Sequence, residues 1–301
     1  MALLQITKTV ASLAACVLLA SPALAMPVET RQAISPRGTG KRMLLWPYTN
    51  TQEVESGSCK TLSTTAQQLA SSSQISMVSN WETWQPKEVP TDLPFSPTVK
   101  DQAHLSGNGW TGLQSVISAK SNVIVQFYNE PNLNGIDATT AAQDWKDHMV
   151  PLRNNNKGLK LVTPACTSDP SSKAWMDSFM GALGDDEQPD YIGLHYYTTS
   201  TNPVKFELDY AQGFIESGYK DYGNSKIPVM ITEMSSTSRD PAQVQQFIEQ
   251  MSTYLDGKDW VHAYGFTGVS TAVADSFSSP AAQLLSSDGT LNALGKMVAG
   301  I

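Results

Sequence analysis

Short apolar segments typical of β-strands recur along this chain, and helical patterns separate most of them. An alternation of strand and helix predicts parallel strands joined by crossover helices. The long interval between Trp81 and Val123 has room for one more strand, for which Phe95–Val99 is the best candidate. Eight units over about 260 residues predict an α/β fold, a single-domain (β/α)8 barrel, rather than an open sheet. The segments recognised directly are Met43–Trp46, Ile75–Trp81, Val123–Asn129, Leu159–Thr163, Tyr191–Tyr197, Pro228–Glu233 and His262–Phe266.

The best-defined helix is predicted to begin after Asp240. Asp240 is a favoured N-cap residue, Pro241 suits the first helical position, and Gly257 stands just beyond the last turn. The apolar residues between them repeat at helical spacing and predict one buried face, made of Val244, Phe247, Ile248, Met251 and Leu255. Similar spacing puts Trp145 and Trp175 on the faces of two other helices, so we expect both in the core.

Residues 1–25 are predicted to be a secretory signal peptide. Lys8 supplies a positive charge, residues 10–20 are apolar, and small residues precede the expected cleavage after Ala25. Residues 26–40 are rich in turn residues, which predicts a flexible leader. The domain is then expected at 41–301, and the Lys41-Arg42 pair is either a dibasic processing site or the start of that domain. We therefore expect a secreted protein without a membrane-spanning segment.

The charge and the cysteines narrow the expected partners and cross-links. A formal net charge of −8 with scattered Lys and Arg argues against nucleic acid, because phosphate binding needs a clustered basic face. We expect a monomer with a neutral or basic partner. Cys59 and Cys166 remain after the signal is removed. An oxidising compartment favours a disulfide between them, but barrel geometry places them on opposite sides of the mouth. Both a disulfide and two free thiols therefore stay as alternatives.

Two glutamates carry the clearest chemical signal. Glu130 follows one β-rich segment directly, and Glu233 ends another. In a barrel of parallel strands, the carboxyl ends of the strands form the active-site face, so the two carboxyls are predicted to lie close together there. A carboxyl pair on either side of a glycosidic bond can protonate the leaving oxygen and attack the anomeric carbon. The pair predicts glycosidase chemistry without a cofactor. No metal is expected either, because His104, His148 and His262 show no metal-ligand spacing.

The strand-end motifs resemble those of glycoside hydrolase family 128, the alkali-sensitive linkage type of catalytic core. The matching motifs are Lys41-Arg42 with Leu45-Trp46-Pro47, Ser79-Asn80-Trp81, Phe127-Tyr128-Asn129-Glu130-Pro131, His195-Tyr196-Tyr197 and Ile231-Thr232-Glu233. The resemblance implies a retaining endo-β-1,3-glucanase, secreted or in the cell wall, that binds β-glucan. It also implies that Glu130 is the acid/base, that Glu233 is the nucleophile, and that Asn129 binds the sugar 2-hydroxyl.

Further side chains are predicted to bind substrate. His195 and Tyr197 alternate onto one face of a strand, where they can orient a carboxylate. Sugars expose apolar C–H faces that stack on aromatic rings, so a glucan cleft needs exposed aromatic residues. The candidates at or after strand ends are Trp46, Trp81, Trp84, Trp110 and Tyr196. The resemblance implies a Trp near the end of the eighth strand, and this chain offers Tyr264 or Phe266 instead.

Two alternatives belong to different classes. Another β-glycanase of the same clan, a mannanase or a β-1,4-glucanase, would share the carboxyl pair. A non-catalytic β-glucan-binding or cell-wall protein would keep the cleft but lose turnover, and the presence of both glutamates argues against it. Endo versus exo action and chain-length preference depend on loop shape, which the sequence does not reveal.

Overall fold

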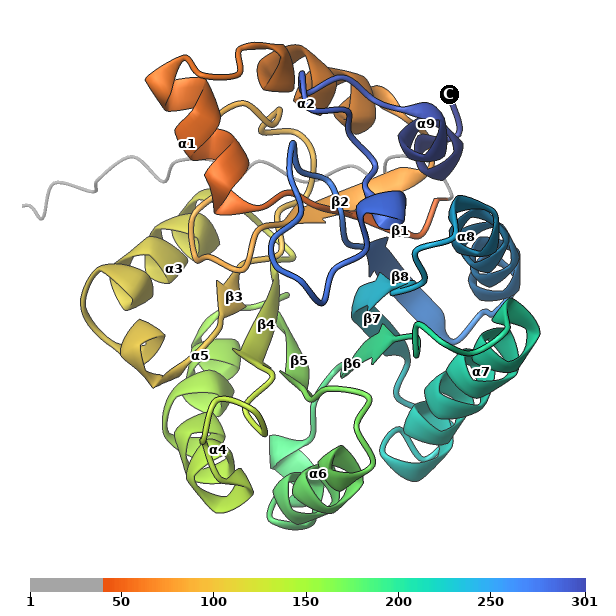
Figure 1. Ribbon diagram of the computed structural model, residues 1–301. Helices are drawn as coiled ribbons and strands as arrows, with labels where there is room; N and C mark the ends of the chain where they lie inside the picture. Colours follow the sequence, from red (N-terminus) through yellow and green to blue (C-terminus); the bar gives the residue numbers. More distant parts are fainter. Residues whose placement is uncertain (1–39) are drawn as a thin grey trace, which may run out of the picture. The chain divides into compact units, whose positions relative to one another are not determined.

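Eight parallel strands form a closed ring in the computed structural model, which describes residues 40–301. Hydrogen bonds group them into a five-stranded sheet, β2-β1-β8-β7-β6, and a three-stranded sheet, β3-β4-β5. Parallel bridges from Val78 to Phe95 and from Val162 to Tyr191 join the two sheets at both edges. The predicted (β/α)8 barrel is therefore confirmed (Figure 1). The strands are β1 (Arg42–Leu45), β2 (Ile75–Ser79), β3 (Thr98–Val99), β4 (Ile124–Asn129), β5 (Lys160–Ala165), β6 (Ile192–Tyr197), β7 (Val229–Ser235) and β8 (Val261–Phe266).

Helices surround the strands (Figure 1). In chain order they are α1 (Tyr48–Ser56), α2 (Thr61–Ser71), η1 (Gln102–Leu105), α3 (Gly107–Ala119), α4 (Ala138–Asp144), η2 (Trp145–Met149), α5 (Val150–Asn155), α6 (Ser171–Gly181), η3 (Asp185–Glu187), α7 (Val204–Asp221), α8 (Pro241–Asp256), η4 (Pro280–Ala282) and α9 (Ala293–Ala299). η2 is a π-helix that continues α4 into α5. The connection from β2 to β3, residues 80–97, contains no helix.

The predicted eighth strand lies where expected, as β3, but it is very short. Pro94 and Pro97 lie just before it and cannot donate backbone hydrogen bonds. The segment still joins the ring, because the Val78 amide donates to the Pro94 carbonyl and the Ser96 amide donates to the Val78 carbonyl. Prolines thus shorten the strand without opening the barrel.

The predicted helix after Asp240 is confirmed as α8. The Asp240 carboxylate accepts a hydrogen bond from the Ala242 amide at 2.9 Å, an N-cap that stabilises a helix by about 1 kcal/mol. All five predicted apolar residues are buried. They pack on the outside of the strands in a large core that also includes residues of α2, α7 and α9.

A separate small core fills the inside of the barrel. It is built from Met43, Leu45, Met77, Val162, Met230 and Ala263. Gly265 of β8 also faces inward, because a Cβ there would lie only 2.7 Å from Leu45 Cγ. These inward residues close the barrel below its mouth.

The start of the domain resolves one alternative. Arg42 begins β1 and pairs with Asp256, while Lys41 donates to the carbonyls of Asp256 and Lys258. This pair is therefore part of the barrel rather than an exposed cleavage site. The predicted signal peptide, and all of the predicted leader except Gly40, lie outside the described residues.

Cys59 and Cys166 are both free thiols in the described chain. Cys59 donates to the Asp288 carbonyl at 3.4 Å. Cys166 is buried beside the end of β5, and burial raises the pKa of its thiol to about 12. The alternative without a disulfide therefore holds. A search of the helices between residues 40 and 301 found none that is both long and apolar enough to cross a membrane.

Candidate active site

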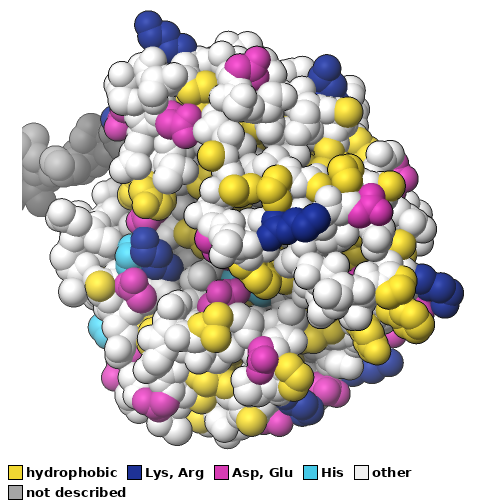
Figure 2. Space-filling model, in the orientation of Figure 1, with side chains coloured by type: hydrophobic (Ala, Val, Ile, Leu, Met, Phe, Trp, Pro, Cys, Tyr) yellow, Lys and Arg dark blue, Asp and Glu magenta, His cyan; other side chains and the backbone are white. Residues whose placement is uncertain are grey.

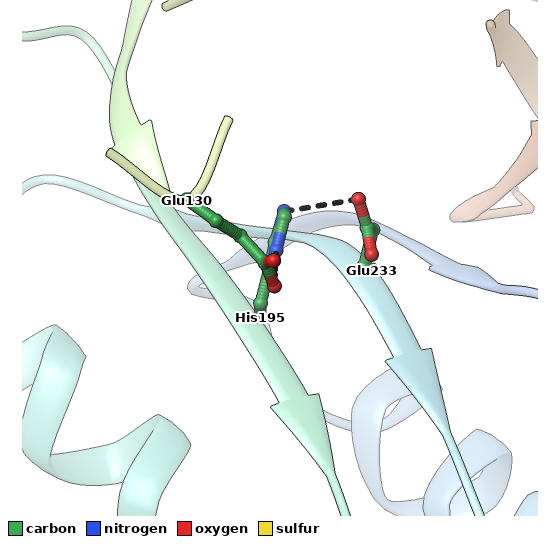
Figure 3. A group of neighbouring side chains, drawn as sticks. All are labelled: Glu130, His195 and Glu233. Atoms are coloured by element: carbon green, nitrogen blue, oxygen red, sulfur yellow. Dashed lines mark hydrogen bonds and ion pairs between the residues drawn. The ribbon is translucent and has the colours of Figure 1, made fainter. Parts of the chain in front are cut away.

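Glu130 and Glu233 meet at one end of the barrel. Glu130 directly follows β4, and its amide donates to the carbonyl of Ala165, the last residue of β5, at 2.9 Å. Glu233 lies near the end of β7, in register with His195 of β6. Figure 3 shows the His195 ring between the two carboxyl groups. The strand-end prediction for both glutamates is met, because parallel strands bring their carboxyl ends to one face.

The backbone at Glu130 is in the left-handed region, with φ of +46°. Trp81, just beyond the end of β2, has φ of +60°. A non-glycine residue in this region costs about 1–3 kcal/mol, and such residues concentrate at functional sites. The Glu130 carbonyl accepts the amides of Leu133 and Asn134, which fixes the turn. Nothing in the sequence indicated this strain, although both residues stand at strand ends.

Glu233 is the more enclosed of the two carboxyls. Trp81 Nε1 donates to Glu233 Oε1 at 2.5 Å, and the Tyr197 hydroxyl donates to Glu233 Oε2 at 2.6 Å. Burial of the ring, and after it the neighbouring charge of Glu233, raise the pKa of Tyr197 well above its usual value, so this hydroxyl stays a donor. Two fixed donors stabilise negative charge on Glu233.

His195 links the two carboxyls. Its Nδ1 lies 3.0 Å from Glu130 Oε1, and its Nε2 lies 3.6 Å from Glu233 Oε1. Burial alone lowers the pKa of His195, but the charges of Glu233 and Glu130 and the hydrogen bond to Glu130 outweigh burial and raise it. A protonated His195 would point one N–H at each carboxyl and would fix their spacing.

The same three residues were tested as a metal site. Glu130, His195 and Glu233 each offer one ligand atom, and these atoms lie within 4.8 Å of one another. A chelate would turn all three atoms to one centre about 2.0–2.2 Å away. Here one imidazole nitrogen faces each carboxyl, so the ring separates the acids. The geometry fits a hydrogen-bonded bridge better than a chelate.

A cleft of about 1110 Å³ opens above this centre. Figure 2 shows a hollow near the middle of this face, with acidic side chains in it. Residues after β5, β6 and β8 and from α7 form most of its wall. Five acids and no Lys or Arg are found among the described residues that line the cleft; the acids are Glu130, Asp169, Glu207, Glu233 and Asp275. The cleft therefore disfavours anionic ligands.

Three of the predicted aromatic contacts, those of Trp46, Tyr264 and Phe266, are wrong, and that of Tyr196 stays a prediction. Trp46 is completely buried, and its indole donates to Glu88 Oε1 at 2.6 Å. Tyr196 faces outward from β6 and packs between Phe214 and Phe247, although part of it borders the cleft wall. Tyr264 and Phe266 also point outward, into the core between the strands and the helices. The Tyr264 hydroxyl contacts Arg42 and Asp256 rather than the mouth.

The tryptophans after β2 and on α3 divide into two groups. Trp81 lines the cleft and donates to Glu233, and its contact with substrate stays a prediction. Trp84 is partly exposed but does not line the cleft. Trp110 packs beside His148 with ring centroids 5.7 Å apart, away from the cleft lining. Asn129 lies at the end of β4 next to Glu130, and its contact with the sugar stays a prediction.

Sequence reasoning missed the aromatic residues on the opposite wall. Phe277, in the connection after β8, and Tyr210, on α7, both line the cleft. Phe277 lies well beyond the end of β8, and Tyr210 lies on a helix, so neither shares the strand-end position of the predicted contacts. Ser168 and Thr167, beyond β5, also line the cleft and add hydroxyl groups.

A barrel whose strand ends carry two facing carboxyls in a hollow defines the class: a glycoside hydrolase. A family model described as "Glycosyl hydrolase catalytic core" matches residues 57–298. A solved structure of a family 128, subgroup VI exo-β-1,3-glucanase from Aureobasidium namibiae is 32% identical, with a TM-score of 0.76. That similarity covers 87% of this chain and 96% of that chain. The chain belongs to glycoside hydrolase family 128, within the glycosyl hydrolase catalytic core.

Two further relatives are more distant. The family 128, subgroup IV endo-β-1,3-glucanase of Lentinula edodes is 22% identical, with a TM-score of 0.68, over 87% of this chain and all of that one, a likeness of fold alone. Alkali-sensitive linkage protein 1 of Schizosaccharomyces pombe is 28% identical over 200 residues, 63% of this chain. The match covers only 34% of that curated relative's length.

Proposed function

We propose that this protein is a β-1,3-glucanase that retains anomeric configuration. The observation that carries the proposal is the carboxyl pair, with an oxygen of Glu130 and an oxygen of Glu233 within 4.8 Å of each other. A direct nucleophile needs carboxyls about 5–5.5 Å apart, whereas inversion needs about 6.5–9.5 Å to admit a water molecule. The short separation supports double displacement.

The two environments support different roles for the two acids. Glu233 receives hydrogen bonds from Trp81 and Tyr197, which stabilise the carboxylate that attacks the anomeric carbon. Glu130 is more open, with its side chain 22% exposed against 10% for Glu233. From there it protonates the departing glycosidic oxygen. It then takes a proton from the water that breaks the glycosyl–Glu233 bond, and the sugar leaves with its original configuration.

The relatives and the cleft charge support the choice of substrate. The Aureobasidium namibiae relative is described as a β-1,3-glucanase. The cleft wall carries acids without any Lys or Arg from the described lining residues, so a neutral glucan is favoured over a polysaccharide with uronic acids or sulfate groups. Mannan and β-1,4-glucan are also neutral and therefore belong among the controls.

The mode of attack has two candidates. Endo action is the expectation from the sequence, and exo action is the mode of the 32% identical relative. Endo action on laminarin releases a ladder of oligosaccharides early, whereas exo action releases one short product from the start. We also propose that the protein is secreted, which N-terminal sequencing of the extracellular protein tests: an intact Met1 on retained protein would contradict it.

The decisive experiment is product analysis by NMR. Purified protein is incubated with laminarin, and with cellulose, mannan and xylan as controls. We expect β-anomers to appear first and only from laminarin. First-formed α-anomers would contradict retention. Hydrolysis of mannan or cellulose at a higher rate would favour the alternative β-glycanases, and binding without turnover would favour the non-catalytic alternative.

A further inference from the structure

Two large aromatic side chains on the cleft wall have little to pack against. Phe277 is 57% exposed and Tyr210 is 61% exposed, and both line the same cleft as Glu130 and Glu233. Single exposed aromatic residues are common on protein surfaces. Two of them on the wall of a cleft that leads to a catalytic pair are a stronger signal, because exposed apolar groups gathered in a groove mark a surface that a ligand covers.

The backbone around Phe277 is firmly held. Asp275 Oδ1 accepts the amides of Phe277 and Ser278 at 2.9 and 2.8 Å. Arg239 donates to the carbonyls of Ser276 and Ser278, and the Ser279 hydroxyl donates to the Ser238 carbonyl. This loop is therefore tied to the start of α8 on both sides of Phe277. A ring presented on a fixed loop loses little conformational entropy when a ligand covers it.

The held ring lies close to the catalytic centre. The Phe277 and Tyr197 ring centroids are 5.4 Å apart, and the Tyr197 hydroxyl donates to Glu233. Tyr197, Phe277 and Tyr210, here called the aromatic arm, line the cleft from the nucleophile out to α7. The arm therefore starts at the side chain that donates to Glu233.

We propose that the aromatic arm is an extended sugar-binding site on which Phe277 and Tyr210 stack glucosyl units beyond the bond that is cleaved. This inference rests on the proposed glucanase function and adds where the rest of the chain binds. The occupant is a neutral β-linked glucan, since its C–H faces match bare rings and the acids of the wall repel anions. The arm lies on the other side of the barrel mouth from the segments after β2 and β3. Those segments carry Trp81, Trp84 and Trp110, which the sequence predicted to stack on the sugar.

The test uses laminari-oligosaccharides of increasing length. The wild type and Phe277→Ala are compared by kcat/KM on the shortest oligosaccharide that the wild type cleaves and on longer ones. Stacking on one aromatic ring is worth about three- to tenfold in affinity. We expect Phe277→Ala to lose about that factor on long chains and little on the shortest one. Tyr210→Ala should act only on chains longer still, because Tyr210 lies on α7, whereas Phe277 packs beside the tyrosine that donates to Glu233.

Phe206→Ala is the matched control. Phe206 is also a phenylalanine, 54% exposed and on α7, but it does not line the cleft. We expect its kcat/KM to match the wild type at every length. Phe277→Tyr should keep most of the long-chain activity, and Phe277→Leu should lose it, while the melting temperatures stay close to that of the wild type.

The outcomes separate this inference from the function on which it rests. If the wild type cleaves no laminari-oligosaccharide, the glucanase proposal fails. If the wild type is active but Phe277→Ala loses the same factor at all lengths, or Phe206→Ala loses as much, the aromatic arm is not a stacking site. Unchanged activity of Phe277→Ala on long chains would overturn the inference as well.

Discussion

The two sides of the barrel mouth differ in what fills them. After β2 and β3 lie Glu82, Lys100, Asp101 and His104, here called the charged rim. Lys100 Nζ lies 2.6 Å from Glu82 Oε1, and His104 Nδ1 lies 2.7 Å from Asp101 Oδ1. Figure 2 shows basic, acidic and histidine side chains together at one margin of the central hollow. The opposite side carries the aromatic arm, with bare rings and hydroxyl groups.

This difference separates stability from binding. The charges of the rim satisfy one another, and no residue of the rim lines the cleft. Phe277 and Tyr210 of the arm are exposed and line the cleft. We therefore expect substitutions in the rim to change stability more than activity, and substitutions in the arm to do the opposite. Glu130 and Glu233 lie between the two sides, and the loss of activity expected from changing them is the reference for the other variants.

The largest effect is expected at the catalytic pair. Glu233→Gln should be nearly inactive on every glycoside, because each turnover needs the nucleophile. Glu130→Gln should lose about 10²–10⁴-fold on polysaccharide but keep some cleavage of an aryl glycoside whose leaving group needs no acid. Azide should then restore turnover of Glu130→Gln and give a β-glycosyl azide. Rescue of Glu233→Gln with retention would mean that the roles must be exchanged.

Two adjacent tyrosines of β6 test the inner end of the arm. Tyr197→Phe removes a donor to Glu233 and should lower kcat/KM about ten- to hundredfold, since a hydrogen bond to a charged group is worth about 1.5–3 kcal/mol. Tyr196→Phe is the matched control, because the Tyr196 hydroxyl contacts Glu207 at 3.2 Å rather than Glu233. Its activity should stay within about twofold. Equal losses of kcat/KM in both variants would show that the effect comes from a disturbance of β6 rather than from the Tyr197 hydroxyl.

The charged rim should respond in stability. Lys100→Met breaks the ion pair with Glu82 and should lower the free energy of unfolding by about 1 kcal/mol or less, because Lys100 is partly solvated. Lys87→Met breaks a much more exposed pair with Glu55 and should have no measurable effect. Laminarin hydrolysis should stay within about twofold for both variants. A larger loss of activity than of stability in Lys100→Met would place the rim in the substrate cleft.

The sequence predicted the barrel well because its signals are local. Apolar periodicity identified seven strands, and a proline-flanked segment supplied the short β3. Strand alternation paired His195 with Tyr197 correctly, and the same rule places Tyr196 on the opposite face. For Tyr264 and Phe266 the alternation could not say which side faces inward. The inward side became clear only from the contact of Gly265 with Leu45.

The shape of the mouth was beyond the sequence for a different reason. Loop conformation depends on contacts between distant segments, such as those of Arg239 with Ser276 and Ser278. Trp84 and Phe277 are both aromatic residues in polar loops, so composition does not distinguish them. Only the fold brings Phe277 to the cleft and leaves Trp84 outside its lining. The left-handed backbone of Glu130 is likewise set by its neighbours.

The smallest expected effect concerns His104 and pH. The hydrogen bond to Glu82 raises the pKa of His104, burial opposes the shift, and the hydrogen bond and charge of Asp101 add to it, while Lys100 opposes it. Protonated His104 therefore stabilises the folded state fully when the pH is below the ordinary histidine pKa of about 6.5. This stabilisation is lost as the pH rises through the higher pKa of His104 in the folded protein. The wild type should exceed His104→Gln in unfolding free energy more at pH 6 than at pH 9, by at most about 1 kcal/mol.

His262 provides the control of opposite sign. Burial, with a smaller contribution from Lys41, lowers the pKa of His262, so the stability tied to its neutral form is present above about pH 6.5 and lost as pH falls through its folded pKa. The advantage of the wild type over His262→Gln should therefore shrink toward acid pH, while its advantage over His104→Gln grows. Urea unfolding of the three proteins at pH 6 and pH 9 measures both trends. If both stability differences changed with pH in the same direction, the charge of His104 would not stabilise the charged rim. The proposed contrast between the charged rim and the aromatic arm would then fail.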